Sequence, residues 1–255
     1  MKTKVVGVIP ARWGSTRFPG KPLKMIAGSS LLSHVIAGSK SSKHVDELIV
    51  ATDHKEIFAE AEKCGVRAVM TDPELASGTD RVWAAIASED FDIAVNIQGD
   101  EPLIRGDIID KLVAPLLENP HLEMATLGRV ISEEDLESPN TAKIVLNRDS
   151  EALYFSRHPI PFTRRAFEAG SDYSQVRKHI GIYGFRTSFL KDFVSAGPSE
   201  LEGLEGLEQL RALSLGAKIK VVTVDHESWG VDTPEDVLKI ERLLKEAKHG
   251  SEEKS

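Results

Sequence analysis

Positive charge and small residues crowd into one segment near the start of the chain, Pro10 to Pro22 (PARWGSTRFPGKP). Its glycines allow backbone N–H groups to approach phosphate oxygens, and Arg12, Arg17 and Lys21 supply positive charge where a pyrophosphate could leave. The segment directly follows an apolar run that is typical of a buried strand, which is where open α/β sheets place their ligand crevice. We therefore predict a phosphate-binding loop that holds a small polyanion.

The loop differs from two common nucleotide-binding patterns. In the Walker pattern, Ser15 would stand at the place of the first glycine, and Pro22 would replace the metal-binding hydroxyl. The loop does not read as GxGxxG either. The sequence therefore indicates a phosphate site of another kind.

Two separate carboxylates are candidates for a magnesium site. Asp100 lies in the segment NIQGDEP at the end of a predicted strand, where Gly99 would allow a sharp exit. Mg²⁺ usually takes one or two carboxylates together with phosphate oxygens, so a second carboxylate is expected elsewhere. Asp232 in the segment GVDTPED is that candidate, although it could instead cap a helix. Glu235 and Asp236 fit the first turn of that helix better than a metal site.

The segment ASGTDR, residues 76–81, gives a weaker signal. Ser77 or Thr79 could simply cap a helix, but Gly78 and the free N–H groups at a helix start also suit a base edge or a phosphate, with Arg81 adding charge.

A polar set in the second half of the chain is weaker still. Tyr183 is equally compatible with plain core, Glu208 with a solvent-facing helix position, and His179 with a satisfied strand histidine. The set consists of Arg157, His179, Tyr183, Glu208 and Gln209.

The elements that must position these residues alternate in the first half of the chain. We predict strands at 4–9, 47–51, 66–70 and 93–97, and helices at 30–37, 54–64, 79–87 and 107–117. After residue 120 we predict strands at 123–130, 142–146, 152–155 and 179–185 without intervening helices, then a strand at 218–224 and a helix at 234–247. The fold class is therefore α/β, a Rossmann-like, doubly wound, mostly parallel sheet with an antiparallel extension.

We expect one domain over residues 1–247, with an antiparallel extension at roughly 121–215. Residues 164–176 are predicted to be a mobile loop, and residues 248–255 a disordered polar tail.

Composition limits the class of protein. The 255 residues carry a net charge of −8, but residues 1–45 contain eight Lys and Arg and no acid, so +8 there stands against −16 in the remainder. This pattern suggests a small polyanion and argues against a nucleic-acid surface. A single cysteine, Cys64, excludes an intramolecular disulfide. No signal segment and no apolar run of membrane-spanning length is recognisable, so we expect no membrane insertion and a cytoplasmic protein.

The order of several motifs adds a resemblance. IPAR-x-x-STR-x-PGKPL, VATD, SGTDR, N-x-QGDEP, MATL, ALYFSR, H-x-GIYGF, LEQLR and VDTPED follow one another along the chain. From about residue 4 to residue 245 the sequence resembles the CMP-Kdo synthetases, also called 3-deoxy-manno-octulosonate cytidylyltransferases.

The resemblance implies a reaction. CMP would pass from CTP to the anomeric hydroxyl of a 3-deoxy-octulosonate sugar acid, with release of pyrophosphate, in a homodimeric enzyme of lipopolysaccharide synthesis. Mg²⁺, held by Asp100 and Asp232, would align the hydroxyl and lower its pKa. The catalytic set would be Arg12, Lys21, Asp100 and Asp232. The nucleotide set would be Ala11, Arg12, Ser15, Lys21, Ser77, Gly78, Arg81 and Gln98. The sugar set would be Gln98, Arg157, His179, Tyr183, Glu208 and Gln209. The resemblance also implies that the extension at roughly 121–215 binds the sugar and forms the dimer contact.

Other functions stay open at this point. The sugar could be Kdo or its 8-amino analogue, because the segments SGTDR and EMATLG resemble those of a branch of the family that prefers the 8-amino sugar. A related cytidylyltransferase for a sialic acid would keep the loop and Asp100 but lack the HIGIYGF and LEQLR segments. A glycosyltransferase would use a nucleotide-sugar instead. A non-catalytic nucleotide-binding regulator should have lost Lys21 or the carboxylates, and this sequence retains them.

Overall fold

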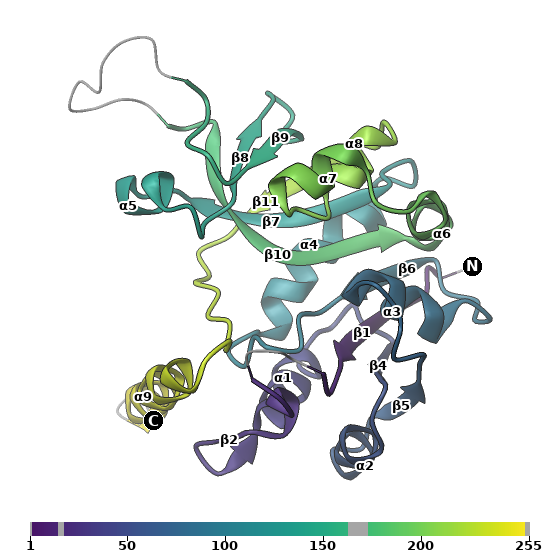
Figure 1. The fold of residues 1–255 in the computed structure, drawn as a ribbon, viewed down its shortest axis with the longest axis vertical. Coiled ribbons are helices and arrows are strands. Elements are labelled where there is room, and N and C mark those ends of the chain that lie inside the picture. Colours follow the sequence, from purple (N-terminus) through teal and green to yellow (C-terminus); the bar gives the residue numbers. More distant parts are fainter. Residues whose placement is uncertain (1, 15–17, 163–172, 253–255) are drawn as a thin grey trace. The chain divides into compact units, whose positions relative to one another are not determined.

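The computed structural model describes residues 2–14, 18–162 and 173–252 (Figure 1). The chain forms two compact units. Unit 1 comprises Met1–Asp110 together with Ser228–Ser255, and unit 2 comprises Lys111–Glu227. Unit 1 is therefore built from two stretches of sequence, and unit 2 from one.

Four parallel strands form the sheet of unit 1, in the order β6-β1-β4-β5. β1 and β6 are buried along nearly their whole length, which is why they read as continuous apolar runs and not as alternating patterns. The strands are β1 (Val5–Ala11), β4 (Glu47–Thr52), β5 (Arg67–Met70) and β6 (Ile93–Asn96).

The helices of unit 1 begin at side-chain caps. Ser30, His54 and Ser77 each accept a hydrogen bond from a backbone N–H in the first turn of α1, α2 and α3, respectively. Helix α2 packs against β4 and β5, and α3 packs against β1, β4 and β6. The helices are α1 (Leu31–Ser39), α2 (Lys55–Lys63), α3 (Gly78–Ile86) and the short 3₁₀ helix η1 (Lys21–Leu23). A small hairpin joins η1 to α1 through β2 (Met25–Ile26) and β3 (Ser29–Ser30).

The last stretch of the chain returns to unit 1 as helix α9 (Pro234–Glu252). Ile26 and Leu31 are buried in one apolar cluster with Val231 and Ile240 from this stretch. The carboxylate of Glu241 also accepts a hydrogen bond of 3.0 Å from the Ala27 N–H. This packing brings Asp232, which lies two residues before the start of α9, into unit 1.

Unit 2 is built on an antiparallel pair, β7 (Met124–Val130) and β10 (Val176–Arg186). β11 (Ile219–Thr223) runs parallel to β7 on its other side. β8 (Lys143–Leu146) and β9 (Ala152–Ser156) form a hairpin, and β8 pairs with β10. The register of β10 against β7 shifts between Ile180 and Tyr183, so β10 carries a bulge there.

One prediction for unit 2 was wrong, because a short helix lies among its strands. We predicted strands alone between residues 123 and 185, but helix α5 (Glu133–Glu137) lies between β7 and β8. The Ser132 hydroxyl caps it by accepting from the Asp135 N–H, and its first turn is acidic, so the capping signal was present in a helix too short to show a period. The other helices are α6 (Thr187–Ala196), α7 (Glu200–Glu205) and α8 (Leu210–Ser214), while α4 (Gly106–Glu118) crosses the boundary between the units.

The predicted α/β fold class is confirmed, but several ends differ. β1 continues through Pro10, where we predicted that proline would end it. Pro10 has no N–H to donate, and β6 pairs with β1 only as far as Val8, so the ladder loses nothing there. Helix α9 continues five residues beyond the predicted end at Ala247, to Glu252. Residues 164–172 of the predicted loop lie outside the described residues, and Val176 already belongs to β10.

Helix α9 is the longest of the described helices, but it is amphipathic and strongly charged. Within the described ranges, no helix combines the length and the apolar character needed to cross a membrane.

Helix α1 passes so close to the segment before α4 that it requires glycine at position 38. A Cβ atom at Gly38 would lie 2.0 Å from the carbonyl oxygen of Ile104, a backbone atom that cannot move away alone. We expect Gly38→Ala to destabilise the protein by about 2 kcal/mol or more, measured as the free energy of unfolding in urea.

Gly203 in α7 provides the matched control, because a Cβ there would meet nothing within 4 Å. Gly203→Ala should stabilise its helix by up to about 1 kcal/mol. Equal effects of the two substitutions would contradict the close approach at Gly38.

Candidate functional site

A pocket of about 310 Å³ lies in unit 1 at the carboxyl ends of β1 and β6 and beside the start of α3. This volume is within the range of small-molecule sites. Several of the residues singled out in the sequence line it: Ala11, Arg12, Lys21, Ser77, Gly78, Arg81, Gln98, Asp100 and Asp232. Ser15 lies outside the described residues. The structure thus brings together residues from four distant segments of the chain.

The ammonium group of Lys21 lies between the two candidate metal-binding carboxylates. Its Nζ is 2.8 Å from Asp100 Oδ2 and 3.2 Å from Asp232 Oδ1. The Val231 N–H donates a 2.9 Å hydrogen bond to the Asp100 carbonyl, so the backbones that carry the two carboxylates are joined as well. Two carboxylates that converge on one cation form a place where positive charge is favoured.

Asp232 is not the cap of α9, which was the structural alternative for it. Thr233 and Asp236 fill that role: the Asp236 carboxylate accepts from the Thr233 N–H at 2.8 Å, and Thr233 Oγ1 accepts from the Asp236 N–H at 3.4 Å. The Asp232 carboxylate is therefore directed to Lys21 instead of to the helix.

Gly99 allows the segment after β6 to pass close to the end of β1. A Cβ atom on Gly99 would lie 2.7 Å from the Pro10 carbonyl oxygen, too close for any other residue. We expected Gly99 to permit a sharp turn, and the structure gives close backbone approach as the reason for glycine. This approach sets Gln98 and Asp100 beside the loop that follows β1.

Arg81 is held in the pocket wall by Asp53. Its Nη2 lies 3.5 Å from Asp53 Oδ2, its Nη1 donates to Thr71 Oγ1, and the side chain is almost fully buried. Burial lowers the pKa of Arg81, the Asp53 carboxylate opposes this, and the charge of Arg12 lowers it further. An arginine still keeps its charge, so a buried cation is available to an anionic ligand.

Asp53 also anchors the loop after β1, because its Oδ1 accepts a 2.9 Å hydrogen bond from the Trp13 N–H. The Trp13 ring stacks on His54, with ring centroids 3.8 Å apart. From the sequence alone, Asp53 could as easily cap the next helix as belong to a ligand site, and Trp13 had no assigned role. The motif VATD at the end of β4 was the available signal.

At the start of α3, the two capping candidates separate. Ser77 is the cap, since its hydroxyl accepts a 3.1 Å hydrogen bond from the Asp80 N–H. Thr79 is buried and receives a 3.1 Å hydrogen bond from Asn96 Nδ2. Gly78 and Ser77 both line the pocket, so the amino end of α3 faces it.

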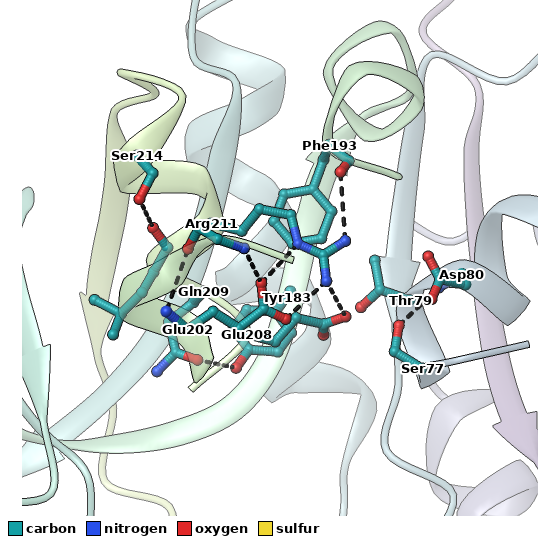
Figure 2. A network of polar contacts seen from close by, with 12 residues as sticks. Ser77, Thr79, Asp80, Tyr183, Phe193, Glu202, Glu208, Gln209, Arg211 and Ser214 are labelled. Carbon is teal, nitrogen blue, oxygen red and sulfur yellow. Dashed lines mark hydrogen bonds and ion pairs between the residues drawn. The ribbon is translucent and has the colours of Figure 1, made fainter. Parts of the chain in front are cut away.

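In unit 2, three of the predicted sugar residues form one hydrogen-bonded chain. Tyr183 donates through its hydroxyl to Gln209 Oε1 at 3.1 Å, as Figure 2 shows. Gln209 Nε2 lies 3.5 Å from His179 Nδ1, and His179 Nε2 lies 3.1 Å from Thr126 Oγ1. Each of these side chains was compatible with a separate structural role, but the structure joins them.

Two members of this hydrogen-bonded chain, His179 and Tyr183, have shifted pKa values. Burial lowers the pKa of His179 to about 3, and the positive charge of Arg157 contributes to the shift. Burial raises the pKa of the Tyr183 phenol, and the Glu208 carboxylate raises it further. The histidine is therefore neutral and the tyrosine protonated at neutral pH.

The segment that carries Glu208 and Gln209 is fixed by Arg211. Its guanidinium makes a bidentate ion pair with Glu202, with N–O distances of 2.7 and 2.9 Å, and lies 4.5 Å from the centre of the Phe193 ring (Figure 2). Such a buried, paired arginine joins α7 to α8, directly after the turn that carries Glu208 and Gln209. Gln209 is thereby presented to Tyr183 from a rigid turn.

Arg157 is the exposed member of the sugar set, and both its side chain and its backbone are held in place, since its Nη1 donates to the Asn140 carbonyl at 3.3 Å. Its N–H donates to Glu205 Oε2 at 3.0 Å, and its carbonyl accepts from Lys143 Nζ at 2.6 Å. Lys143 is fully buried and donates to two further carbonyls, those of Ser138 and Thr141. Sequence reasoning missed Lys143, because a lysine in a strand reads as exposed.

Comparisons with known proteins agree with this geometry. A family model described as Cytidylyltransferase matches residues 6–219. A 3-deoxy-manno-octulosonate cytidylyltransferase of Bdellovibrio bacteriovorus is 52% identical over 94% of this chain and 98% of its own length. The chain belongs to the 3-deoxy-manno-octulosonate cytidylyltransferase family. Another member, from Thermodesulfovibrio yellowstonii, is 45% identical over 93% of this chain and 96% of its own.

A solved structure supports the same family. A CMP:2-keto-3-deoxy-manno-octonic acid synthetase in complex with CTP has a TM-score of 0.90 and 38% identity, and covers 96% of this chain and 100% of its own. The cytidylyltransferase resemblance and the α/β fold class are thus confirmed. The roles predicted for single residues stay predictions.

Because the pKa of His179 is low in the folded protein, the free energy of unfolding should depend on pH. The pKa of His179 falls from 6.5 to about 3 on folding. Between these two pH values the imidazole is therefore protonated in the unfolded chain but not in the folded one. This group's contribution to stability is complete above pH 6.5 and is lost as the pH falls toward about 3. Between about pH 6.5 and about pH 4.5, the wild-type unfolding free energy should fall about 2 kcal/mol more than that of His179→Gln.

Urea unfolding at these two pH values measures the difference. His121→Gln, at an exposed position in the same unit, is the control and should follow the wild type. Parallel curves for the wild type and His179→Gln would contradict the assigned pKa.

Proposed function

We propose that this cytidylyltransferase transfers CMP from CTP, with Mg²⁺, to the anomeric hydroxyl of a 3-deoxy-octulosonate sugar acid and releases pyrophosphate. The observation that carries the proposal is Lys21, paired with both Asp100 and Asp232 in a pocket that also contains Arg12 and Arg81. Family membership supports the reaction class. In this proposal, unit 1 holds the nucleotide and the sugar set of unit 2 holds the acid.

The cations of unit 1 suit a triphosphate. Arg12 and Lys21 line the pocket beside the loop after β1, and Arg81 adds a buried charge from α3. An arginine cannot serve as a base at neutral pH, so these groups stabilise the charge that develops on the leaving pyrophosphate. The amino end of α3, at Ser77 and Gly78, offers N–H groups to the cytidine or a phosphate. Gln98 lines the same pocket and offers an amide for base or sugar recognition.

The donor set fits Mg²⁺ but leaves the coordination incomplete. Asp100 and Asp232 converge on one point, as their shared contact with Lys21 demonstrates. Among the described residues, no group of three or more His, Cys, Asp or Glu could hold a metal without help. Mg²⁺ characteristically combines one or two carboxylates with phosphate oxygens and water, so this pair suits a metal that arrives with the nucleotide. When bound, the metal supplies charge neutralisation for the polyphosphate and the attacking oxygen.

Beyond binding and charge stabilisation, the proposed reaction requires no further chemical step from the protein side chains. An in-line attack on the α-phosphorus breaks the bond to pyrophosphate and needs no covalent enzyme intermediate. The chain supplies orientation and positive charge, and the neutral His179, Tyr183 and Gln209 supply fixed hydrogen-bonding groups for sugar hydroxyls. Arg157 is the cation of unit 2 that we assign to the sugar carboxylate, and Glu208 the acceptor beside it.

The test is pyrophosphate release from CTP and Mg²⁺ with Kdo and 8-amino-Kdo in parallel. N-acetylneuraminate is the control for a sialic acid enzyme, and ATP and GTP are controls for the nucleotide. We expect release with an octulosonate and CTP only, and loss of release when EDTA removes the metal. Release with N-acetylneuraminate, or with ATP in place of CTP, would overturn the proposed substrates.

Substitutions at the point of convergence test the mechanism. Lys21→Ala and Asp100→Asn should each lower turnover by a factor of about 100 or more, because the first removes a cation that stabilises the polyphosphate and the second removes a carboxylate that would hold Mg²⁺. Circular dichroism should show both variants folded. Lys24→Ala, an exposed lysine three residues further along, is the matched control and should keep wild-type turnover. Wild-type turnover in either site variant would refute the assigned roles.

We also propose a homodimer, a cytoplasmic location and a role in lipopolysaccharide synthesis, all of which rest on family membership. Light scattering tests the homodimer, and a single species at the monomer mass would contradict it.

A further inference from the structure

A buried hydroxyl that the proposed reaction does not use lies at the centre of the unit 2 network. Thr126 on β7 is fully buried. Its Oγ1 lies 3.1 Å from His179 Nε2, 2.9 Å from the Ile182 carbonyl and 3.3 Å from the Ile180 carbonyl. We propose that Thr126 is a positioning residue that selects the tautomer of His179, and through it sets which groups of Gln209 and Tyr183 face a sugar acid.

The bulge in β10 creates this arrangement. The register of β10 against β7 shifts between Ile180 and Tyr183, and Tyr183 is the residue paired with Thr126. The extra residues in β10 bring two carbonyl groups, those of Ile180 and Ile182, to the hydroxyl of one threonine. Bulges re-aim side chains and are common beside active sites. Here the bulge is filled by a side-chain hydroxyl.

The hydroxyl's surroundings determine where its proton lies. Carbonyl oxygens only accept hydrogen bonds, and a threonine hydroxyl has one proton to donate. Because the Ile182 carbonyl is at 2.9 Å, that proton is directed to it, and the lone pairs of Thr126 Oγ1 face His179. His179 Nε2 must then carry the hydrogen. Since His179 is neutral, its Nδ1 is left as an acceptor.

The choice of tautomer passes along the chain to Gln209. An acceptor at His179 Nδ1 requires the Gln209 amide to present its Nε2 group, as it does at 3.5 Å. The amide oxygen is therefore directed to Tyr183, whose hydroxyl donates to it at 3.1 Å. With the opposite tautomer, the lone pair of His179 Nε2 would face the lone pairs of Thr126 Oγ1, acceptor against acceptor. The Gln209 amide would then turn over, so that its oxygen accepts from His179 and its Nε2 group donates to the Tyr183 oxygen.

Two free hydrogen-bonding positions result. Gln209 retains a second N–H that can donate, and the Tyr183 oxygen retains lone pairs that can accept. This pair suits a hydroxyl group that donates and accepts at once, which the sugar acid of the proposed function carries. Valine would fill the same volume as Thr126 in a buried strand without the cost of burying a hydroxyl. The presence of a hydroxyl at this position therefore favours a role in its hydrogen bonds.

The experiment reads the tautomer directly. Protein with ¹⁵N-labelled histidine is compared by long-range ¹H–¹⁵N NMR as wild type, Thr126→Val and Thr126→Ser. We expect the wild-type His179 ring to show a protonated Nε2 and an unprotonated Nδ1. Thr126→Val should convert this signal to a mixture or to the other tautomer, and Thr126→Ser, which restores the hydroxyl, should return it.

Kinetics extend the readout to the sugar. Thr126→Val should raise the KM for the sugar acid by about tenfold, the worth of about one hydrogen bond, and leave the KM for CTP within about twofold. Thr223→Val, the same change at an exposed position of β11, is the control and should alter neither value.

Two results would overturn the proposal: a wild-type His179 with its proton on Nδ1, or an unchanged tautomer in folded Thr126→Val. If Thr126→Val fails to fold, the wild-type and Thr126→Ser spectra still decide. Absence of turnover with every sugar acid would overturn the proposed function, on which the kinetic half rests, while the spectra would still decide the role of Thr126.

Discussion

The pairing of Lys21 with Asp100 and Asp232 is the interaction on which the organisation of unit 1 depends. Two carboxylates that approach one another repel, and the lysine between them removes that cost. The three residues follow β1, follow β6 and precede α9, respectively. The pocket therefore exists only when the sheet and the returning C-terminal stretch are both in place, and the Val231–Asp100 backbone hydrogen bond ties them together.

Both units apply the same rule to the charges that they bury. Arg81 is held by Asp53, Arg211 by Glu202, and Lys143 by three carbonyl groups. A buried charge is tolerated only when its partners are complete, and a complete set of partners also fixes its orientation. The result is polar surfaces that are ordered before a ligand arrives, so less of the binding free energy is lost in ordering them.

The sequence was most informative where local pattern and position coincide. The parallel strands of unit 1 are continuous apolar runs, and the loop after β1 carries its charges within thirteen residues, so both could be found without a structure. Asp232 could be named as a partner of Asp100 because a magnesium site usually takes a second carboxylate and because the family motifs contain both residues, but no local pattern links positions 100 and 232. The ion pair with Lys21 was not predicted, because long-range packing of α9 creates it.

In unit 2 the sequence was less informative. The short helix α5 has no room for a helical period, and Lys143 reads as an exposed strand residue although it is fully buried. Thr126 stands in a recognisable motif, MATL, but its contact with two carbonyl groups depends on a bulge in a strand more than fifty residues away. Register shifts of this kind depend on the pairing of two strands, and a single strand's sequence does not specify them.

The discontinuous construction of unit 1 has a consequence for how the protein is made. During synthesis the ribosome delivers β1 to β6 first, then the whole of unit 2, and only then the stretch with Val231 and Ile240. Until that stretch emerges, the apolar surface at Ile26 and Leu31 lacks its cover, and unit 2 can complete its own folding in the meantime. A nascent chain therefore exposes an apolar surface throughout the translation of unit 2, and the stretch translated after unit 2 both covers that surface and brings the second carboxylate to the pocket.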